Sequence, residues 1–149
     1  MTAFFLVLLI FSVLLLAYYR IPLLISIAIL AGQLGYPTSE AHMRARLASL
    51  LDQTERHAVV VASTADTLTG WIHVMRVDRL EMPPHGEIAA LVVGEEYRGH
   101  GIGARLVEAS VRWTHNAGLA HLTVRSRIER DDAHRFYQRM GFSMEKTQR

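Results

Sequence analysis

The sequence contains no cysteine among its 149 residues, has only four prolines, and shows no run of basic side chains. The absence of cysteine excludes disulfide bonds, thiolate zinc sites and a cysteine nucleophile. Lysine and arginine number 16 against 14 aspartates and glutamates, and this near balance of charge predicts no nucleic-acid partner. Eight histidines are present, but none follows another at a spacing typical of metal ligands, so the sequence predicts no metal site.

Hydrophobic composition is not low enough, and charge not high enough, for a disordered chain. Hydrophobic residues make up 50% of the sequence and charged residues 20%, which is typical of globular proteins. The length suits one domain with a core of its own and is short for two.

Charge is missing from one long stretch, the N-terminus. Residues 3–19 contain Ser12 as the one plainly polar side chain, Arg20 follows, and residues 21–31 are again almost wholly apolar. Seventeen residues in a helix span about 25 Å, the lower limit for crossing the hydrocarbon core of a bilayer. On this hydropathy we expect residues 3–31 to contact a membrane.

The end of this first apolar run resembles a membrane anchor. Tyr18, Tyr19 and Arg20 are the aromatic and cationic types found at a membrane surface. We therefore expect an apolar N-terminal helix in residues 1–31, a candidate transmembrane anchor, before a domain over residues 32–149. Two other interpretations stay open: a buried strand and helix of the domain itself, or a misassigned start of the sequence.

The rest of the sequence alternates between helix and strand signals. Thr38 or Ser39 can cap a helix after Pro37, and Ile102, Leu106, Ala109 and Trp113 recur at helical spacing. The expected strands are 57–63, 70–77, 87–93 and 121–126, with further helices before Gly118 and over 131–140 and a last strand begun by "GFSMEK". This order predicts an α/β (α+β) fold: a mixed, mostly antiparallel central sheet flanked by helices, with one parallel crossover.

A glycine-rich loop lies between the strand at 87–93 and the next helix. The segment "EYRGHGIGARL" places glycines at 99, 101 and 103, beside Arg98. Free backbone amides that lead into a helix N-terminus form an anion site, so the loop predicts a phosphate ligand. The dinucleotide fingerprint does not fit, because five residues separate the strand from Gly99 and the following strand ends in Arg125 and Ser126 rather than in an acidic residue.

Two motifs resemble the GNAT superfamily of N-acetyltransferases. The family signature R/Q-x-x-G-x-G/A corresponds to Arg98–Gly103, and "AHRFYQRMGF" (133–142) is similar to its later motif A-x-x-x-Y-x-x-x-G-F. The resemblance implies acetyl-CoA as co-substrate, with its pyrophosphate on the amides of residues 98–104 and its pantetheine along the strand at Leu91–Val93. The implied cofactor-binding residues are Leu91, Val92, Val93, Arg98, Gly99, His100, Gly101, Ile102, Gly103 and Ala104.

The resemblance also implies catalytic roles. Tyr137 stands at the family's general-acid position, where a phenol can protonate a departing thiolate, and its alternative role is a core ring beside Phe136. Glu87 begins the cofactor strand and is the candidate base, acting through a water, and its alternative is a solvated strand-end carboxylate. The backbone N–H near Leu91 is the implied oxyanion donor. Trp71, His73 and Tyr36 are candidates for the lining of the acceptor pocket.

These expectations define an N-acetyltransferase that acts on a primary amine of an unidentified acceptor, by direct attack in a ternary complex. The alternative is a noncatalytic acyl-CoA-binding module at a membrane. A small-molecule or peptide amine and a second copy of the chain are the candidate partners. The anchor predicts a membrane-anchored protein with a cytoplasmic catalytic domain, and the alternative is a soluble cytoplasmic one. The sequence departs from the family at Arg130, where an asparagine is common, and in the residues available for a first strand, 19–22.

Overall fold

The computed structural model describes residues 4–6, 27–32, 38–64, 67–125 and 131–143. Residues 27–32 are helical. The other elements, in chain order, are β1 (Phe4–Leu6), α2 (Glu40–Leu51), β2 (His57–Thr64), β3 (Thr67–Val77), β4 (His85–Val93), the short 3₁₀ helix η1 (Glu95–Tyr97), α3 (Ile102–Asn116), β5 (Leu122–Val124) and α4 (Asp131–Arg139).

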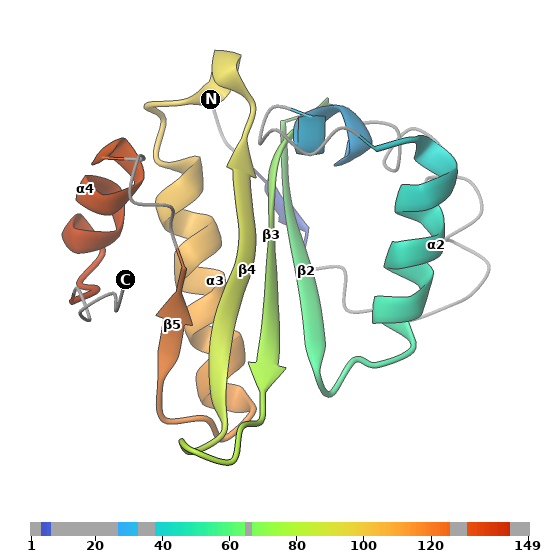
Figure 1. Cartoon of the computed structure of the whole chain (residues 1–149). Coiled ribbons are helices and arrows are strands. Elements are labelled where there is room, and N and C mark those ends of the chain that lie inside the picture. Colours follow the sequence, from blue (N-terminus) through green and yellow to red (C-terminus); the bar gives the residue numbers. More distant parts are fainter. Residues whose placement is uncertain (1–3, 7–26, 33–37, 65–66, 126–130, 144–149) are drawn as a thin grey trace.

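The strands form one five-stranded sheet in the order β1-β2-β3-β4-β5. Neighbours from β1 to β4 are antiparallel, and β5 lies parallel to β4. The link from β4 through α3 to β5 is the single crossover that the sequence predicts. Figure 1 shows α3 against one face of the sheet, α4 beside β5, and α2 at the other side of the molecule. The predicted mixed, mostly antiparallel sheet flanked by helices is therefore confirmed.

The α3 face of the sheet carries the larger hydrophobic core. The helical spacing of Ile102, Leu106 and Ala109 turns these side chains onto Val60 and Ile72 of the sheet, and Leu106 is fully buried. Further along the chain, rings of α4 pack against the same core. This face therefore supplies much of the apolar burial that holds the fold together.

The opposite face is covered less completely. Ser39 caps α2 by accepting a hydrogen bond from the backbone N–H of His42 at 3.2 Å, as predicted for Thr38 or Ser39. No residue of α2 is buried, and only Met43 and Leu47 among its side chains pack against the core on this side. The buried side chains of this face come instead from the strands and from residues 27–32.

Most of the predicted anchor, residues 7–26, lies outside the described residues, and the described parts of the N-terminal segment belong to the domain. Phe4–Leu6 forms β1, whose Phe5 pairs with Ala62 of β2, and the helical residues 27–32 bury Ile27 and Leu30 in the core around Trp71. Among the described residues, no helix is both long enough and apolar enough to cross a membrane. Of the apolar segment, residues 27–32 therefore contribute side chains to the core of the domain, which removes their apolar surface from water.

Several sequence expectations fall on residues outside the described ranges. They include the aromatic and cationic residues Tyr18, Tyr19 and Arg20, and the first strand expected from the family at 19–22. Tyr36, a candidate for the acceptor pocket, and Arg130, where the family commonly has an asparagine that contacts the cofactor, lie there too. The predicted last strand also lies mostly in residues 144–149, which the structure does not describe.

Candidate active site

The strand β4 has two halves with different neighbours. β3 pairs with it from His85 to Val93, whereas β5 pairs with it only at Gly86, Glu87 and Ile88. From Ala89 to Val93, the upper half of β4, no strand among the described residues pairs with the edge on the β5 side. An open strand edge presents backbone N–H and C=O groups to any molecule with amide groups of its own.

A bulge at Ala89 marks the change between the two halves. The register runs from Val74 opposite Ile88 to His73 opposite Ala90, so Ala89 has no directly opposed residue. Because the bulge inserts one residue, Ile88 and Leu91 both face the α3 core, while Ala90 faces the α2 side. The side chains after Ala89 are therefore shifted by one position, in their alternation between the two faces, relative to those before it.

The backbone of the upper half points into the open edge at alternate residues. The carbonyl oxygen of Val93 accepts a hydrogen bond from Nε of Arg98 at 3.2 Å, so this carbonyl faces away from β3. Alternate residues of a strand direct their backbone groups to the same side, which places the N–H and C=O of Leu91 at the open edge too. Leu91 is the residue whose N–H the sequence predicts as the oxyanion donor.

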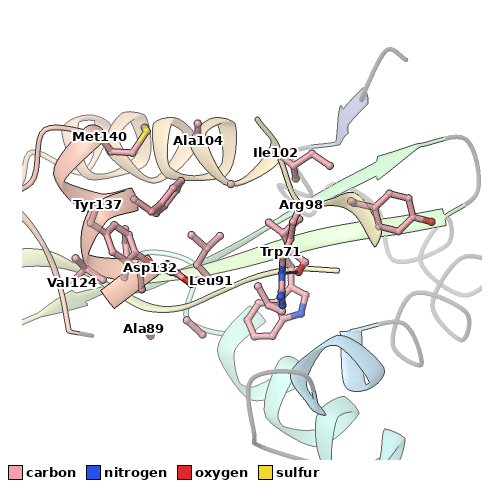
Figure 2. Close-up of a pocket in the computed structure, with 18 of the residues that line it drawn as sticks. Trp71, Ala89, Leu91, Arg98, Ile102, Ala104, Val124, Asp132, Tyr137 and Met140 are labelled. Atoms are coloured by element: carbon pink, nitrogen blue, oxygen red, sulfur yellow. Dashed lines mark hydrogen bonds between the residues drawn. The ribbon is translucent and has the colours of Figure 1, made fainter. Parts of the chain in front are cut away.

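A cleft of about 1380 Å³ opens along this edge. Its walls come from β4, the glycine loop, the start of α3, α4 and part of α2. Figure 2 shows Leu91 on the cleft wall between Tyr137 of α4 and Trp71 of β3. The cleft therefore reaches both faces of the sheet, with the α3 and α4 side at one end and the α2 side at the other.

The glycine loop forms one end of the cleft. Gly99 and Gly101 have φ angles of +80° and +78°, which only glycine adopts without strain, and a Cβ added at either would meet nothing within 4 Å. α3 begins at Ile102 with Gly101 as its N-cap residue, and no side chain caps this end. The first amides of α3 therefore face the cleft with the positive end of the helix dipole, as an anion site requires.

The predicted cofactor residues lie together with one exception. Leu91, Val92, Val93, Arg98, Gly99, Gly101, Ile102, Gly103 and Ala104 all line the cleft. His100 does not, because its Nδ1 lies 3.0 Å from the carbonyl oxygen of Arg98 and 3.2 Å from that of Tyr97. The imidazole of His100 thus hydrogen-bonds to the loop backbone, rather than pointing into the cleft.

Tyr137 is held at the cleft by the end of α4. Gly141 has φ +92°, the N–H of Phe142 donates to the carbonyl of Tyr137 at 3.0 Å, and that of Gly141 donates to Gln138 at 3.0 Å. This is a Schellman motif, and its usual hydrophobic contact is made here by the rings of Tyr137 and Phe142, with centroids 5.5 Å apart. The glycine and phenylalanine of the predicted motif therefore fix the position of the tyrosine ring.

Glu87 lies outside the cleft. It is in the lower, fully paired half of β4, between Met75 of β3 and Thr123 of β5. Its side chain is 15% exposed and one carboxylate oxygen is 3.6 Å from Nε of Arg125. The structure therefore brings Tyr137 and the loop together at the cleft, but not Glu87, because the bulge at Ala89 separates that residue from the open edge.

Two histidines form a pair on the α2 side of the sheet. Nδ1 of His57 lies 3.1 Å from Nε2 of His73. Burial, and then the charge of His57, lower the pKa of His73 to about 4, while burial and the charge of Arg56 lower the pKa of His57. Sequence reasoning proposed His73 for the acceptor pocket but missed the pair. The signal that would have found it is the hairpin register, which makes the two residues diagonal neighbours on one face.

Buried polar atoms without partners also lie on the α2 side of the cleft. Trp71 is 8% exposed, and its Nε1 has no hydrogen-bond partner within the described structure. The hydroxyl of Thr38 is likewise buried and unpaired there, and both residues line the cleft with Met43 and Arg46 of α2. A buried indole N–H without an acceptor is costly, so a bound molecule that supplies an oxygen gains from it.

Comparison with known proteins agrees with this architecture. The Acetyltransferase (GNAT) family model matches residues 25–142 of the chain. N-alpha-acetyltransferase 30 of Schizosaccharomyces pombe is 37% identical over 57 residues, which cover 38% of this chain and 38% of that protein. The chain spans less than half the length of the first curated relatives it matches.

Solved structures share the fold. A GNAT family acetyltransferase of Staphylococcus aureus superposes with a TM-score of 0.74 at 19% identity, covering 99% of this chain and 96% of that chain. An aminoglycoside N-acetyltransferase in complex with CoA superposes with a TM-score of 0.72 at 22% identity, covering 85% of this chain and 84% of that chain. At these identities the likeness shows that the arrangement of strands and helices is the same.

Proposed function

Because the chain belongs to the Acetyltransferase (GNAT) family, we propose that it transfers an acetyl group from acetyl-CoA to a primary amine by direct attack in a ternary complex. The observation that supports this most strongly is the open edge of β4, which leads directly into the glycine loop. A long substrate with amide groups at one end and phosphates at the other matches these two features in order. The sequence has no cysteine, so a thioester intermediate on the enzyme is excluded.

The residues of the cleft fit acetyl-CoA. Leu91 presents backbone groups that can pair with the pantetheine amides, as an added strand would. Gly99 and Gly101 leave open space where a side chain would otherwise hinder a phosphate, and the amides at the start of α3 supply donors. Arg98 adds a positive charge beside the loop.

The reaction then needs three steps. The acceptor's ammonium loses a proton, its nitrogen attacks the thioester carbonyl, and the carbon–sulfur bond breaks. We assign the N–H of Leu91 to the developing oxyanion, because its backbone faces the open edge. Tyr137 is on the cleft wall and its phenol is the proposed proton donor to the departing thiolate of CoA.

The acceptor enters, in this proposal, from the α2 side of the cleft. The unpaired N–H of Trp71 and the hydroxyl of Thr38 support an acceptor that carries oxygen atoms near its amine. Met43 supplies apolar contact on the same side. The acceptor's identity is a question for a screen of amines.

Calorimetry with acetyl-CoA and release of free CoA from a panel of amines test the proposal. The panel includes an aminoglycoside, an amino sugar and a peptide with a free N-terminus. Because the protein has no thiol, a thiol-reactive chromophore reports only the released CoA. We expect binding and turnover, and no mass increase of the protein after incubation with acetyl-CoA alone. Binding without turnover on any amine would instead support the noncatalytic module.

The role of Tyr137 is tested by Tyr137→Phe. This change keeps the ring contact with Phe142 and removes only the hydroxyl. We expect kcat to fall about 100-fold, at the lower end of the usual range for loss of a general acid, and the Kd for acetyl-CoA to stay the same. An unchanged kcat on a competent amine would show that another group protonates the thiolate.

A further inference from the structure

We propose that His73 and His57 form a proton relay that takes a proton from the acceptor's ammonium group and releases it to solvent. The inference rests on the proposed function, because it supplies the base that acetylation of an amine needs. The inference starts from one contact, the 3.1 Å between Nδ1 of His57 and Nε2 of His73. The two ring centroids are 5.3 Å apart, and the rings are tilted by 34°.

The relay begins beside the cleft. On β4 the residue directly opposite His73 is Ala90, which lines the cleft, and Trp71, on the same face of β3, lines it as well. Directly opposed residues of an antiparallel pair have Cβ atoms about 5 Å apart. His73 itself does not line the cleft but lies beside two residues that do, and the relay assigns a bridging water to the gap between its imidazole and the amine.

The relay ends near solvent. On the α2 face, Trp71, His73 and Met75 follow one another along β3, and His57 of β2 lies opposite Met75. His57 is therefore further from Trp71 than His73 is, and its side chain is only partly buried. No residue of α2 is buried, so this helix does not seal the lower part of the sheet. A proton on the outer nitrogen of His57 can therefore leave to bulk water.

The hydrogen bond between two neutral imidazoles requires one donor and one acceptor. The relay uses the tautomer in which Nε2–H of His73 donates to Nδ1 of His57, and His57 carries its own proton on Nε2. Nδ1 of His73 then holds a lone pair toward the incoming proton. This tautomer is part of the proposal.

One proton enters and one proton leaves in each turnover. The ammonium gives a proton through water to Nδ1 of His73, Nε2–H of His73 passes to Nδ1 of His57, and Nε2–H of His57 passes to solvent. The pair is neutral before and after, with each proton moved to the other nitrogen of its ring. The freed amine attacks the thioester carbonyl, and exchange with water restores the first tautomer.

Charged groups around the pair favour its neutral form. Arg56 directly precedes His57, and its charge together with burial lowers the pKa of that histidine. Burial, followed by the charge of His57, lowers the pKa of His73 to about 4. Glu87 on β4 faces the same side of the sheet, but Arg125 lies 3.6 Å from its carboxylate, and Arg46 of α2 lines the cleft above. At neutral pH the pair is therefore uncharged, as the relay requires at its start.

His73→Gln and His57→Gln test the relay in the full chain, with an amine that the panel identifies. We expect His73→Gln to lower kcat at pH 7 at least tenfold and to leave the Kd for acetyl-CoA unchanged. The loss shrinks toward pH 9 to 10, because free amine then reaches the cleft without a base. His57→Gln gives a smaller loss with the same trend. His115→Gln, at the exposed end of α3, is the matched control and keeps full activity at every pH.

A histidine NMR titration tests the pair without any substrate. We expect His73 to titrate near 4 in the wild type, and its pKa to rise in His57→Gln, because the charge of His57 is one cause of the lowering. Titration of His73 near 6.5 in both proteins would contradict the pair.

The kinetic results separate this inference from the function itself. A wild type that turns over an amine while His73→Gln is equally active, or equally impaired at all pH values, overturns the relay alone. A wild type that binds acetyl-CoA but acetylates no amine overturns the proposed function and, with it, the relay. Should His73→Gln fail to fold, His73→Asn replaces it and is judged by the same dependence on pH.

Discussion

The two faces of the sheet are built in different ways. On one face α3 buries six of its residues against the strands, and two of these, Ser110 and Thr114, satisfy their hydroxyls on carbonyls of the previous turn. On the other face α2 buries none, the buried apolar side chains come from the strands and from residues 27–32, and a pair of histidines and a carboxylate lie partly buried nearby. The α3 face is therefore closed by one well-packed helix, whereas the α2 face combines a core with titratable groups.

The difference shows how a small domain accommodates a polar site. Groups that exchange protons need water and alternative hydrogen bonds, which a dry, close-packed core excludes. With the α3 face supplying stability, the α2 face can remain partly open. The cleft lies where the two meet, because consecutive residues of a strand face opposite sides: Leu91 faces α3, and Ala90 and Val92 face α2.

The largest expected effect compares the two faces directly. Leu106 is fully buried on the α3 face, whereas Leu47 of α2 is only partly buried. We expect Leu106→Ala to lower the free energy of unfolding by about 3 kcal/mol and Leu47→Ala by about 1 kcal/mol or less. Urea unfolding of both variants measures this. Equal losses would mean that the α2 face contributes as much to stability as the α3 face.

The second prediction separates loss of the anion site from the loss of stability that backbone strain causes. Gly101 and Gly118 flank α3 with φ angles of +78° and +72°, and both have open space where a Cβ would lie. We expect Gly101→Glu to weaken acetyl-CoA binding about 100-fold or more, since a carboxylate would enter the anion site. Gly118→Glu carries similar strain at the other end of the helix.

Calorimetry on the two glycine variants distinguishes the causes. Comparable losses of unfolding free energy, with affinity lost only in Gly101→Glu, assign the anion site to the start of α3. Retained affinity in Gly101→Glu would contradict the loop assignment.

Signals confined to a few neighbouring residues predicted the fold and the cleft well. The alternating glycines, the helical spacing of Leu106 and Ala109, and the glycine after α4 each act within one or two turns of chain. Their structural consequences therefore follow from local backbone chemistry, and the sheet, the crossover and the positions of the loop and Tyr137 agree with them. Strand ends were less exact: β3 begins at Thr67 rather than at 70, and β5 spans only Leu122–Val124.

Features that depend on distant contacts were not predictable in the same way. Hydropathy cannot tell burial in lipid from burial in a protein core, which is why residues 27–32, whose Ile27 and Leu30 are buried in the domain, were expected in an anchor. The bulge at Ala89 leaves no mark in "EIAALVV", so Glu87 could not be placed outside the cleft from sequence. The histidine pair required the register of a hairpin, which a sequence does not state.

The smallest expected effect is a dependence of the free energy of unfolding on pH, caused by the histidine pair on the α2 face. The pKa of His73 is about 4 in the folded protein and near 6.5 in the unfolded chain. Between these values the unfolded chain binds more protons, so the free energy of unfolding is highest above pH 6.5 and falls as the pH is lowered toward 4. His57, whose pKa is also lowered, acts in the same direction.

Urea unfolding at pH 7.5 and pH 4.5 measures this dependence. We expect the wild type to lose about 2 kcal/mol over the interval through His73, after allowance for its partial exposure to water. His73→Gln loses correspondingly less, because its side chain does not titrate. Asp78 does not obscure the result, since a hydrogen bond from Arg76 lowers the pKa of its carboxyl below its usual range. An equal loss in both proteins would show that the protonation of other groups, and not of His73, destabilises the fold in acid.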